Sequence, residues 1–575
     1  MPSTLQSIYA HYATQDFRAA LDLFDNLEVE PDPADERLMA TVAQCHFKTG
    51  DKYQAACFFL RAARAGTPPK LQFASLAFEL ARMQEDNWTA LKAAEVILKI
   101  APDHATAAQF RRHHLFGFLE LDELKAANDA ALAGIQAGRK LALSCELPHN
   151  HIMWMGDERL NARIADSRFP LYSEHDRLQR RNRPHLFGDR IRIGYLSGDV
   201  SSAHATMILM RGVLEQHDRE KFDIRIYCNT PGDLIARDDG LRKHIGTIVD
   251  IKAMSDDEVA ARMRADGIDI LVDLKGHTRD ARIGVVNAGP APIQVAWLGF
   301  PGSAVGIDCD YVIGDRIVTP DESRPFYHEK FCRLPDCYQP NDDHHRPLPP
   351  PALRAGLGLP EDRFVFASFN NVRKISPEVA SAWARILNGT ADSVLWIMCN
   401  DERARAHFLA WMKQRGIEGE RIIFARTIGR EAHAARLQAA DLCLDTFPCN
   451  GHTTTSDCLW SGLPVLTVRG RNFASRVSES LLRTIGLPEL VAPTVEDYVA
   501  KAIGLSRNRG EIGRLRTRLI GNRATTPLFD TERFTRHLEN AYTMMVVRAK
   551  SGLPPDHFDV PALDNAGVES SLTAA

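Results

Sequence analysis

Apolar and small residues in the first 150 positions follow the pattern of packed helix pairs. This stretch is rich in Ala and Leu and lacks runs of β-branched residues. An aromatic residue followed by small residues recurs at Phe17, Tyr53 and Trp88, which are 36 and 35 residues apart. A fixed period of this length is typical of stacked helical repeats, whose helices cross closely at small side chains. The pattern predicts about three or four repeats or, alternatively, a plain helical bundle. Either stack would leave a groove of the kind that binds peptides.

From Arg190 onward, short apolar runs alternate with amphipathic stretches, as in sheets with crossover helices. We expect strands at 191–196, 224–227, 248–251, 270–273, 293–297 and 311–314, and a helix at 256–265. A Pro-rich linker, QPNDDHHRPLPPPA, follows at 339–352. The alternation then restarts, with strands expected at 364–368, 394–399, 421–424, 442–444 and 465–468, and helices at 377–387, 402–414, 431–439, 454–460 and 474–484.

The predicted fold is therefore α/β with an all-α N-terminal part. We expect a helical repeat region at 1–150, a helical connector at 151–189, a first Rossmann-like lobe at 190–338, the linker at 339–352, a second Rossmann-like lobe at 353–552 and a flexible tail at 553–575. Ligands of doubly wound sheets bind at the carboxyl ends of the strands. In a clamshell of two such lobes, these ends face each other across a cleft where two substrates would meet.

Composition narrows the class of protein. Apolar residues make up 45% and charged residues 25% of the 575 residues, as in an ordinary globular protein. The net charge is −4 and no long Lys/Arg block is present, so no nucleic-acid partner is expected. The 11 cysteines are scattered without a C-x-x-C pair, which predicts reduced thiols and a cytoplasmic protein. No secretory signal and no apolar run long enough to span a membrane is visible.

The most informative segment is DLCLDTFPCNGHTTTSDCLWSG at 441–462. A strand leads through a loop with Pro and Gly into a helix that begins with Thr453, Thr454 and Thr455. Free N–H groups and the positive end of the helix dipole make such a start an anion site, which would suit a pyrophosphate. Asp457, one turn further, would accept two hydrogen bonds from a ribose diol. Alternatively, Thr454 is only an N-cap and Asp457 its partner in the first turn.

A second segment, FVFASFNNVRKIS at 364–376, places a lysine just after a buried strand. The strand ends in Asn370 and Asn371, and Arg373 and Lys374 follow. The ammonium group of Lys374 would offset charge on a departing phosphate, as a point charge and without a metal. A solvated lysine at the start of a helix is the alternative interpretation.

Two regions of the first lobe supply further candidates. In GYLSGDVSSAHAT at 194–206, His204 would act as a base or an orienting group, with a structural histidine as the alternative. The loop lacks G-x-G-x-x-G, so dinucleotide binding is not expected. In DLKGHTRDAR and PAPIQVAWLGFPG, the residues His277, Leu298 and Gly299 are candidate sugar contacts, with ordinary turns as the alternative.

No metal site is expected. Asp308-Cys309-Asp310 formally matches the D-x-D signature of metal-dependent sugar transferases, but it lies away from the nucleotide motifs. His344 and His345 lie in the linker and lack a partner at the spacing of metal ligands.

These motifs resemble the protein O-GlcNAc transferase family, including its short bacterial members. LDTFPCNGHTTTSDCLW is the sharpest match, and FNNVRKI, PAPIQVAWLGFPG, SRVSESLL and TPLFDTERFTRHLENAY also fit. The helical region resembles tetratricopeptide repeats. The resemblance implies a GT-B arrangement, with the acceptor on the first lobe and the nucleotide sugar on the second. It also implies inverting, metal-independent transfer of GlcNAc from UDP-GlcNAc to Ser/Thr hydroxyls of a protein or peptide that docks along the repeats.

The resemblance also implies roles for matching residues. Lys374 would stabilise the leaving UDP, and His204 matches a histidine once proposed as base. Thr453 and Thr454 beside His452 would bind phosphate, Asp457 the ribose, His433 and Arg436 the uracil, and Cys449, Leu298 and Gly299 the sugar, with Asn370, Asn371 and His277 as further contacts. Two positions depart from the family. Asp199 and His204 are five residues apart instead of four, and Asn371 stands where Gln is frequent.

Alternatives to this function stay open. The loop CNGHTT favours UDP-GlcNAc, whereas plant-type protein O-fucosyltransferases resemble DTFPYAGTTTT and bacterial N-glucosyltransferases resemble FPFGN there. The same fold would also serve another sugar (glucose, fucose or a nonulosonic acid) or another acceptor, such as flagellin or an adhesin. A non-catalytic repeat scaffold is the third possibility, against which the retained Lys374, CNGHTT and Asp457 argue. The oligomeric state is not predicted.

Overall fold

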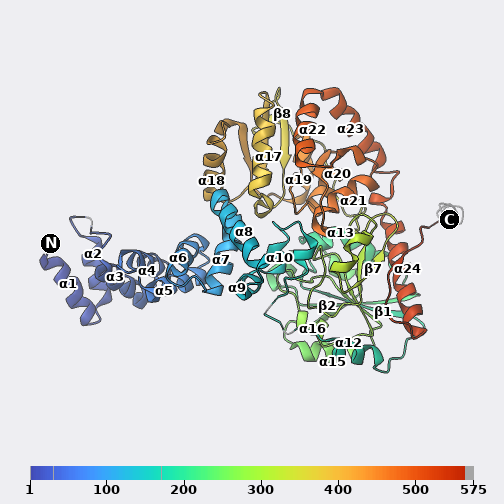
Figure 1. Ribbon diagram of the computed structural model, residues 1–575, viewed down its shortest axis with the longest axis horizontal. Coiled ribbons are helices and arrows are strands. Elements are labelled where there is room, and N and C mark those ends of the chain that lie inside the picture. The colour runs from blue at the N-terminus through green and yellow to red at the C-terminus, as the bar shows by residue number, and fades with distance from the viewer. Residues whose placement is uncertain (1, 30, 167, 170, 564–575) are drawn as a thin grey trace. The chain divides into compact units, whose positions relative to one another are not determined.

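The computed structural model describes residues 2–29, 31–166, 168–169 and 171–563, which belong to two compact units. One unit runs to Glu146, and the other begins at Leu147. Figure 1 labels their helices and strands.

The first unit consists of helix pairs. Its helices are α1 (Pro2–Ala13), α2 (Phe17–Asp25), α3 (Glu36–Thr49), α4 (Lys52–Ala65), α5 (Leu71–Met83), α6 (Asn87–Ile100), α7 (Ala105–Phe118), α8 (Leu121–Gln136) and α9 (Lys140–Cys145). The N-caps of α2, α4 and α6 are Asp16, Asp51 and Asp86, which are 35 residues apart. Each aspartate accepts a backbone N–H from the first turn of its helix. This period confirms the predicted region of helical repeats.

The second unit opens with three short helices, α10 (Pro148–His151), α11 (Glu158–Asn161) and α12 (Glu174–Asn182). A first lobe follows, with a parallel sheet ordered β14-β7-β6-β5-β4-β1-β2-β3. Its strands are β1 (Ile191–Ser197), β2 (Phe222–Cys228), β3 (Thr247–Asp250), β4 (Ile270–Asp273), β5 (Ile293–Ala296), β6 (Tyr311–Gly314), β7 (Lys330–Arg333) and β14 (Phe558–Asp559). Its main helices are α13 (Ala205–Gln216), α15 (Asp256–Ala265) and α16 (Ile283–Asn287).

The second lobe repeats this plan with a sheet ordered β10-β9-β8-β11-β12-β13. Its strands are β8 (Phe364–Ser368), β9 (Ser393–Met398), β10 (Ile422–Ala425), β11 (Leu442–Leu444), β12 (Val465–Val468) and β13 (Val491–Ala492). Its helices are α17 (Pro377–Asn388), α18 (Glu402–Lys413), α19 (Arg430–Leu437), α20 (Thr453–Trp460), α21 (Val477–Thr484), α22 (Val495–Arg507) and α23 (Arg509–Asn522). Both sheets run outward in two directions from a central pair, so the predicted pair of Rossmann-like lobes is confirmed.

The C-terminal segment differs from the sequence-based expectation. We expected residues up to 552 to belong to the second lobe and residues 553–575 to form a flexible tail, of which 564–575 lie outside the described residues. Instead, α24 (Thr531–Lys550) packs its Leu538 and Tyr542 into the core of the first lobe, and β14 pairs with β7 of the first sheet. Figure 1 shows α24, in red, beside the green first lobe. The linker is also more ordered than its composition suggests, because Asn341 and Asp342 are buried.

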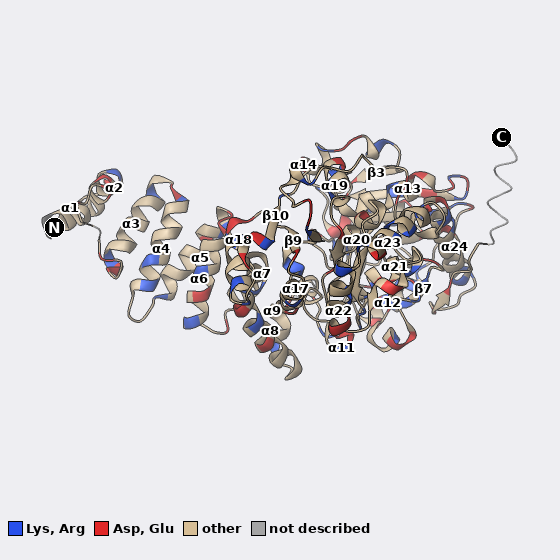
Figure 2. Cartoon of the chain, turned by 90° about the horizontal axis from the view of Figure 1, so that it is seen from above, with Lys and Arg blue, Asp and Glu red and all other residues tan. Residues whose placement is uncertain are grey.

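Charged residues of both signs are interspersed along the chain (Figure 2). Figure 2 shows Lys and Arg interspersed with Asp and Glu along the helices of both units. Within the described ranges, none of the helices is both long and apolar enough to cross a lipid bilayer.

Candidate active site

Most of the expected site residues of the second lobe follow β8 and β11, the two strands at the centre of the second sheet. Asn370 and Lys374 come after β8, and Cys449 and His452 come after β11. The order of the strands reverses between this central pair, and such a switch point opens a crevice at the carboxyl ends of the strands.

The loop between β11 and α20 is held rigidly by a carboxylate, that of Asp445, which the sequence analysis did not single out. Its Oδ1 accepts the backbone N–H of Gly451 at 2.7 Å and Asn370 Nδ2 at 3.2 Å. Its Oδ2 accepts the hydroxyl of Thr467 at 2.7 Å. Asn370, an expected ligand contact, is therefore engaged as a buried brace of the loop.

The loop leads directly into α20, and the start of this helix has no side-chain cap. His452 occupies the N-cap position, but its side chain accepts no backbone N–H from the helix. Thr453 and Thr454 form the first turn and are half-buried. Burial, and secondarily the charge of Lys374, lowers the pKa of His452 well below its usual range, so the ring is neutral. An uncapped helix start leaves N–H groups and the positive dipole end available to an anion.

Lys374 reaches the same loop from the other strand. It ends a short 3₁₀ turn (Val372–Lys374), and its Nζ donates to the carbonyl of Asn450 at 2.5 Å. Its charge opposes the effect of burial, which raises the pKa of Cys449. Asn371 is exposed, and its Oδ1 caps the turn by accepting the N–H of Arg373 at 3.0 Å. Lys374, Cys449 and His452 are thus brought together as expected.

A second group lies on α19. Arg436 Nε donates to His433 Nδ1 at 2.9 Å, and both side chains contact the ring of Phe369, which directly follows β8. Burial lowers the pKa of His433 to about 4, so this imidazole is neutral at physiological pH. His433 and Asp457 line one cavity, which places two of the expected nucleoside contacts side by side.

The first lobe reaches the second through Phe300. Phe300 packs against an apolar cluster of Ile152, Cys449 and Ala474, and its ring meets that of His277 edge-on at 5.0 Å. His277 and Cys449, two expected sugar contacts, therefore both lie close to Phe300. Ile152 was not predicted from the sequence, since an apolar residue in a short connector helix gives no chemical signal.

Leu298 and Gly299 have structural roles in the first lobe. Leu298 packs against the core of the first lobe and has a positive φ of 71°. A Cβ on Gly299 would lie 2.0 Å from the carbonyl oxygen of Leu274, so this position accepts no side chain. The alternative interpretation of this loop, as a tight turn, therefore accounts for both residues.

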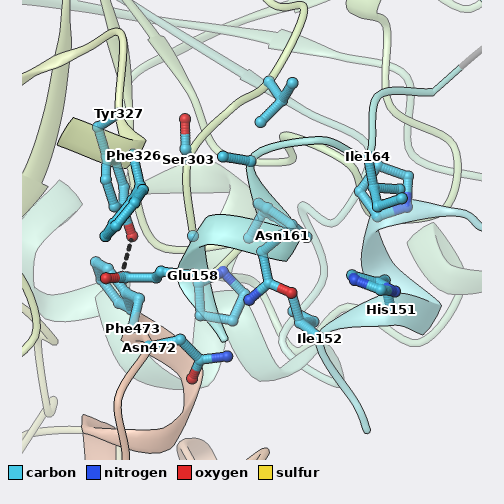
Figure 3. Close-up of a pocket in the computed structure, with 16 residues that line it drawn as sticks. His151, Ile152, Glu158, Asn161, Ile164, Ser303, Phe326, Tyr327, Asn472 and Phe473 are labelled. Atoms are coloured by element: carbon cyan, nitrogen blue, oxygen red, sulfur yellow. Dashed lines mark hydrogen bonds between the residues drawn. The ribbon is translucent and has the colours of Figure 1, made fainter. Parts of the chain in front are cut away.

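The connector segment is bonded to both lobes beside these residues. Asn472 of the second lobe donates to the carbonyl of Met155 at 2.9 Å, and Tyr327 of the first lobe donates to Glu158 at 3.0 Å. Glu158 and Tyr327 line a pocket that is drawn in Figure 3, where their hydrogen bond is dashed. Arg373, next to Lys374, donates to Asn150 at 2.9 Å. The connector therefore forms part of the wall of the crevice, which sequence analysis did not foresee.

His204 is placed differently from a free base. It is the N-cap of α13, where Nδ1 accepts the backbone N–H of Thr206 at 3.3 Å. Its Nε2 lies 3.5 Å from Asp199 Oδ1, and burial lowers its pKa. A neutral ring with Nδ1 as acceptor carries its proton on Nε2 and has no lone pair left for a substrate hydroxyl. This geometry argues against the expected role as base.

The D-x-D signature is engaged by arginines. Arg180 binds Asp308 at 2.7 Å and Asp310 at 2.9 Å, and all three side chains are at most 2% exposed. Arg177 and Arg181 complete this buried network, which fastens α12 to the first lobe. Both carboxylates are thus used by the fold. Among the described residues, no cluster of three His, Cys, Asp or Glu side chains with the geometry of a metal site occurs.

Known proteins are similar to this chain in sequence. A 378-residue stretch is 36% identical to the probable UDP-N-acetylglucosamine--peptide N-acetylglucosaminyltransferase SEC of Arabidopsis thaliana and covers 64% of this chain and 38% of the plant protein. The UDP-N-acetylglucosamine--peptide N-acetylglucosaminyltransferase of Caenorhabditis elegans is 27% identical over 482 residues, which cover 64% of this chain and 42% of that protein. The chain thus spans about two fifths of the length of these relatives.

A solved structure matches nearly the whole chain. A mutant of the O-GlcNAc transferase of Thermobaculum terrenum has a TM-score of 0.63 and 26% identity, and the match covers 96% of this chain and 99% of that one. The family model of glycosyl transferase family 41 matches residues 172–350 and 351–538, which include most of both lobes and every site residue of the second lobe named above. The chain therefore belongs to glycosyl transferase family 41.

Proposed function

We propose that this chain transfers GlcNAc from UDP-GlcNAc to Ser or Thr hydroxyls of proteins, with inversion at the anomeric carbon and without a metal. The observation that carries the proposal is the position of Lys374. At the switch point of the second sheet, its ammonium group donates to the loop that leads into the uncapped start of α20. An ammonium group and free backbone N–H groups are together suited to a diphosphate. The names of the relatives support the choice of donor and acceptor.

In the proposed reaction, the acceptor oxygen attacks C1 of the sugar from the face opposite UDP. The bond from C1 to the acceptor oxygen forms as the bond from C1 to the β-phosphate oxygen breaks, and the hydroxyl proton passes to water, so that the products are the glycosylated protein, UDP and a proton. The enzyme contributes positioning and the stabilisation of the departing diphosphate. Lys374 and the first turn of α20 would hold the pyrophosphate, Asp457 the ribose, and His433 with Arg436 the uracil.

The acceptor and the compartment belong to the same proposal. A protein or peptide would dock along the helical repeats, whose stacked pairs offer an extended surface. All 11 cysteines are free thiols, and all except Cys57 are buried. Unpaired thiols suit a reducing compartment, which supports a cytoplasmic location.

Substitution of Lys374 by Met tests the mechanism. Removing the ammonium leaves the negative charge that develops on UDP uncompensated, and we expect the transfer rate to fall at least about 100-fold, while the melting temperature stays within a few degrees. The exposed Lys413→Met, at the end of α18, is the matched control. Transfer is measured as the added mass of a co-expressed protein. A chelator should have no effect, and full activity of Lys374→Met would refute the mechanism.

The donor is tested separately with a panel of UDP- and GDP-sugars. We expect UDP-GlcNAc to raise the melting temperature the most and to be the donor that is hydrolysed or transferred. Stabilisation and turnover by another sugar alone would favour the same fold with a different donor. Absence of UDP affinity in calorimetry would instead favour a non-catalytic scaffold.

A further inference from the structure

Arg346, in the linker between the lobes, is a buried arginine whose guanidinium is incompletely matched by its surroundings. Its side chain is 1% exposed. Nη1 lies 3.2 Å from Asp457 Oδ1, yet none of Nε, Nη1 and Nη2 forms a hydrogen bond with any described residue. The group also lies near the ring of Phe529, with Cζ 5.7 Å from its centroid. A guanidinium carries five N–H donors, and burying them unbonded is costly.

These donors border a small cavity in the second lobe. Arg346 lines it together with Arg430 and His433 of α19 and Asp457 of α20. Its volume is about 30 Å³. A water needs roughly 10–15 Å³ on this scale, so the cavity admits about two hydroxyl-sized groups and not a whole nucleoside.

A pair of hydroxyls would satisfy both sides of the cavity. Each hydroxyl has one donor and two acceptor sites, so it can donate to the Asp457 carboxylate and accept from the Arg346 guanidinium. Burial raises the pKa of Asp457, and the charges of Arg346 and Arg430 oppose that effect and favour the ionised, accepting form. The ribose of a nucleotide carries two such hydroxyls on adjacent carbons.

The linker holds Arg346 in position from the second lobe. Trp460 Nε1 of α20 donates to the carbonyl of Pro347 at 3.2 Å, and Gln438 donates to the carbonyl of Pro349 at 2.8 Å. The backbone that carries the guanidinium is therefore fixed against α19 and α20, the two helices that supply the rest of the cavity wall.

We propose that Arg346 is a positioning residue of the nucleotide site, which donates hydrogen bonds to the ribose hydroxyls and orients the Asp457 carboxylate toward them. The inference rests on the proposed function, because it takes UDP as the ligand. It adds a residue of the interlobe linker to the groups that hold the donor.

Calorimetric titration with UDP and 2′-deoxy-UDP tests this role. The intact wild-type chain should bind UDP about 10-fold or more tightly than 2′-deoxy-UDP, since the deoxy ligand leaves buried donors unpaired. Arg346→Met should weaken UDP binding by about 10- to 100-fold and bring the ratio of the two affinities close to 1. Arg346→Lys keeps the charge without the fork and should retain part of the affinity for UDP.

Arg354→Met is the matched control. Arg354 lies in the same stretch of chain and is paired with Asp441 at 2.8 Å, but it does not line the cavity. This variant should keep the wild-type ratio of affinities, whatever it does to the melting temperature. If Arg346→Met does not fold, Arg346→Lys carries the test through the same ratio.

The outcomes separate the two proposals. If the wild-type chain binds UDP and both Arg346 variants keep its full affinity and its preference over the deoxy ligand, the role of Arg346 is refuted while the proposed function stands. An equal loss for both ligands would also refute the role, because a general structural defect does not distinguish them. If the wild-type chain does not bind UDP, the proposed function and this inference fail together.

Discussion

Nδ1 of His204 accepts the backbone N–H of Thr206, and Nε2 lies 3.5 Å from Asp199. The side chain is therefore committed to the start of α13 and to the buried pair of Asp199 with Lys275, whose charged atoms are 2.6 Å apart. These contacts cannot be inferred from the residue type alone. Histidine is the most frequent general base, and the backbone contact that removes its lone pair exists only in the fold.

Substitution of His204 by Ser separates capping from base catalysis. Serine keeps an N-cap acceptor, so we expect stability close to wild type and a transfer rate within a few-fold of it. His204→Ala removes the cap and should lower the free energy of unfolding by about 1 kcal/mol, still with transfer retained. Thermal unfolding and the rate of transfer are measured for both variants. Loss of about 100-fold or more in rate for the serine variant, with UDP binding unchanged, would restore the base role.

Site residues were predictable where they lie in a distinctive sequence motif and where their role follows from their own side chain. Lys374, Cys449 and His452 converge as expected, because the motifs that contain them follow neighbouring strands of one sheet. Residues whose role depends on a partner far along the chain were not predictable. Asp445 and Arg346 are of this kind, since their partners are found only when the loops are packed.

At the scale of elements, the 35-residue spacing of Asp16, Asp51 and Asp86 shows how the helical unit encodes its repeats. In the sequence the period is visible as recurring aromatic residues, and in the structure an N-cap recurs with the same period. Each N-cap residue defines where the second helix of a pair begins, at the same position in every repeat. The length of a strand decides whether its sequence pattern can be recognised. Strands with longer apolar runs were predicted, whereas β13 and β14 are only two residues long and have no recognisable pattern.

Asp51→Ala tests the contribution of one repeated cap. The side chain of Asp51 accepts the N–H of Gln54 at 3.0 Å, and its loss should destabilise α4 by about 1 kcal/mol. Hydrogen exchange of the amides in α4 should accelerate about 5-fold, while exchange in α15 stays unchanged. Asp51→Asn retains an acceptor and is the control. Equal exchange rates for alanine and asparagine variants would show that the cap does not matter.

At the scale of the whole second unit, the chain leaves the first lobe, builds the second, and returns. The side chains of α24 join the first core, where Tyr195 and Tyr542 lie 3.1 Å apart through their hydroxyls. The order of elements along the chain predicts that α24 belongs to the second lobe, because it follows that lobe. Its amphipathic pattern indicates that one face is buried, but not which sheet buries it.

Leu538→Ala tests which lobe depends on α24. Leu538 is fully buried in the first core, and a cavity there should cost about 2–5 kcal/mol. Hydrogen exchange should rise in β1 and β2 and stay unchanged in β8 and β9. Val547→Ala on the same helix is the control, because that side chain is 58% exposed. Faster exchange confined to β8 and β9 would show that α24 stabilises the second lobe instead.

The return of the chain through α24 also constrains motion. The polypeptide passes between the lobes once in the linker and once more before Asp530, the N-cap of α24. Two covalent connections define a line, and rotation about that line is the relative movement that stretches neither of them. Relative movements of the lobes that stretch either connection are therefore disfavoured compared with rotation about the line that joins the two connections.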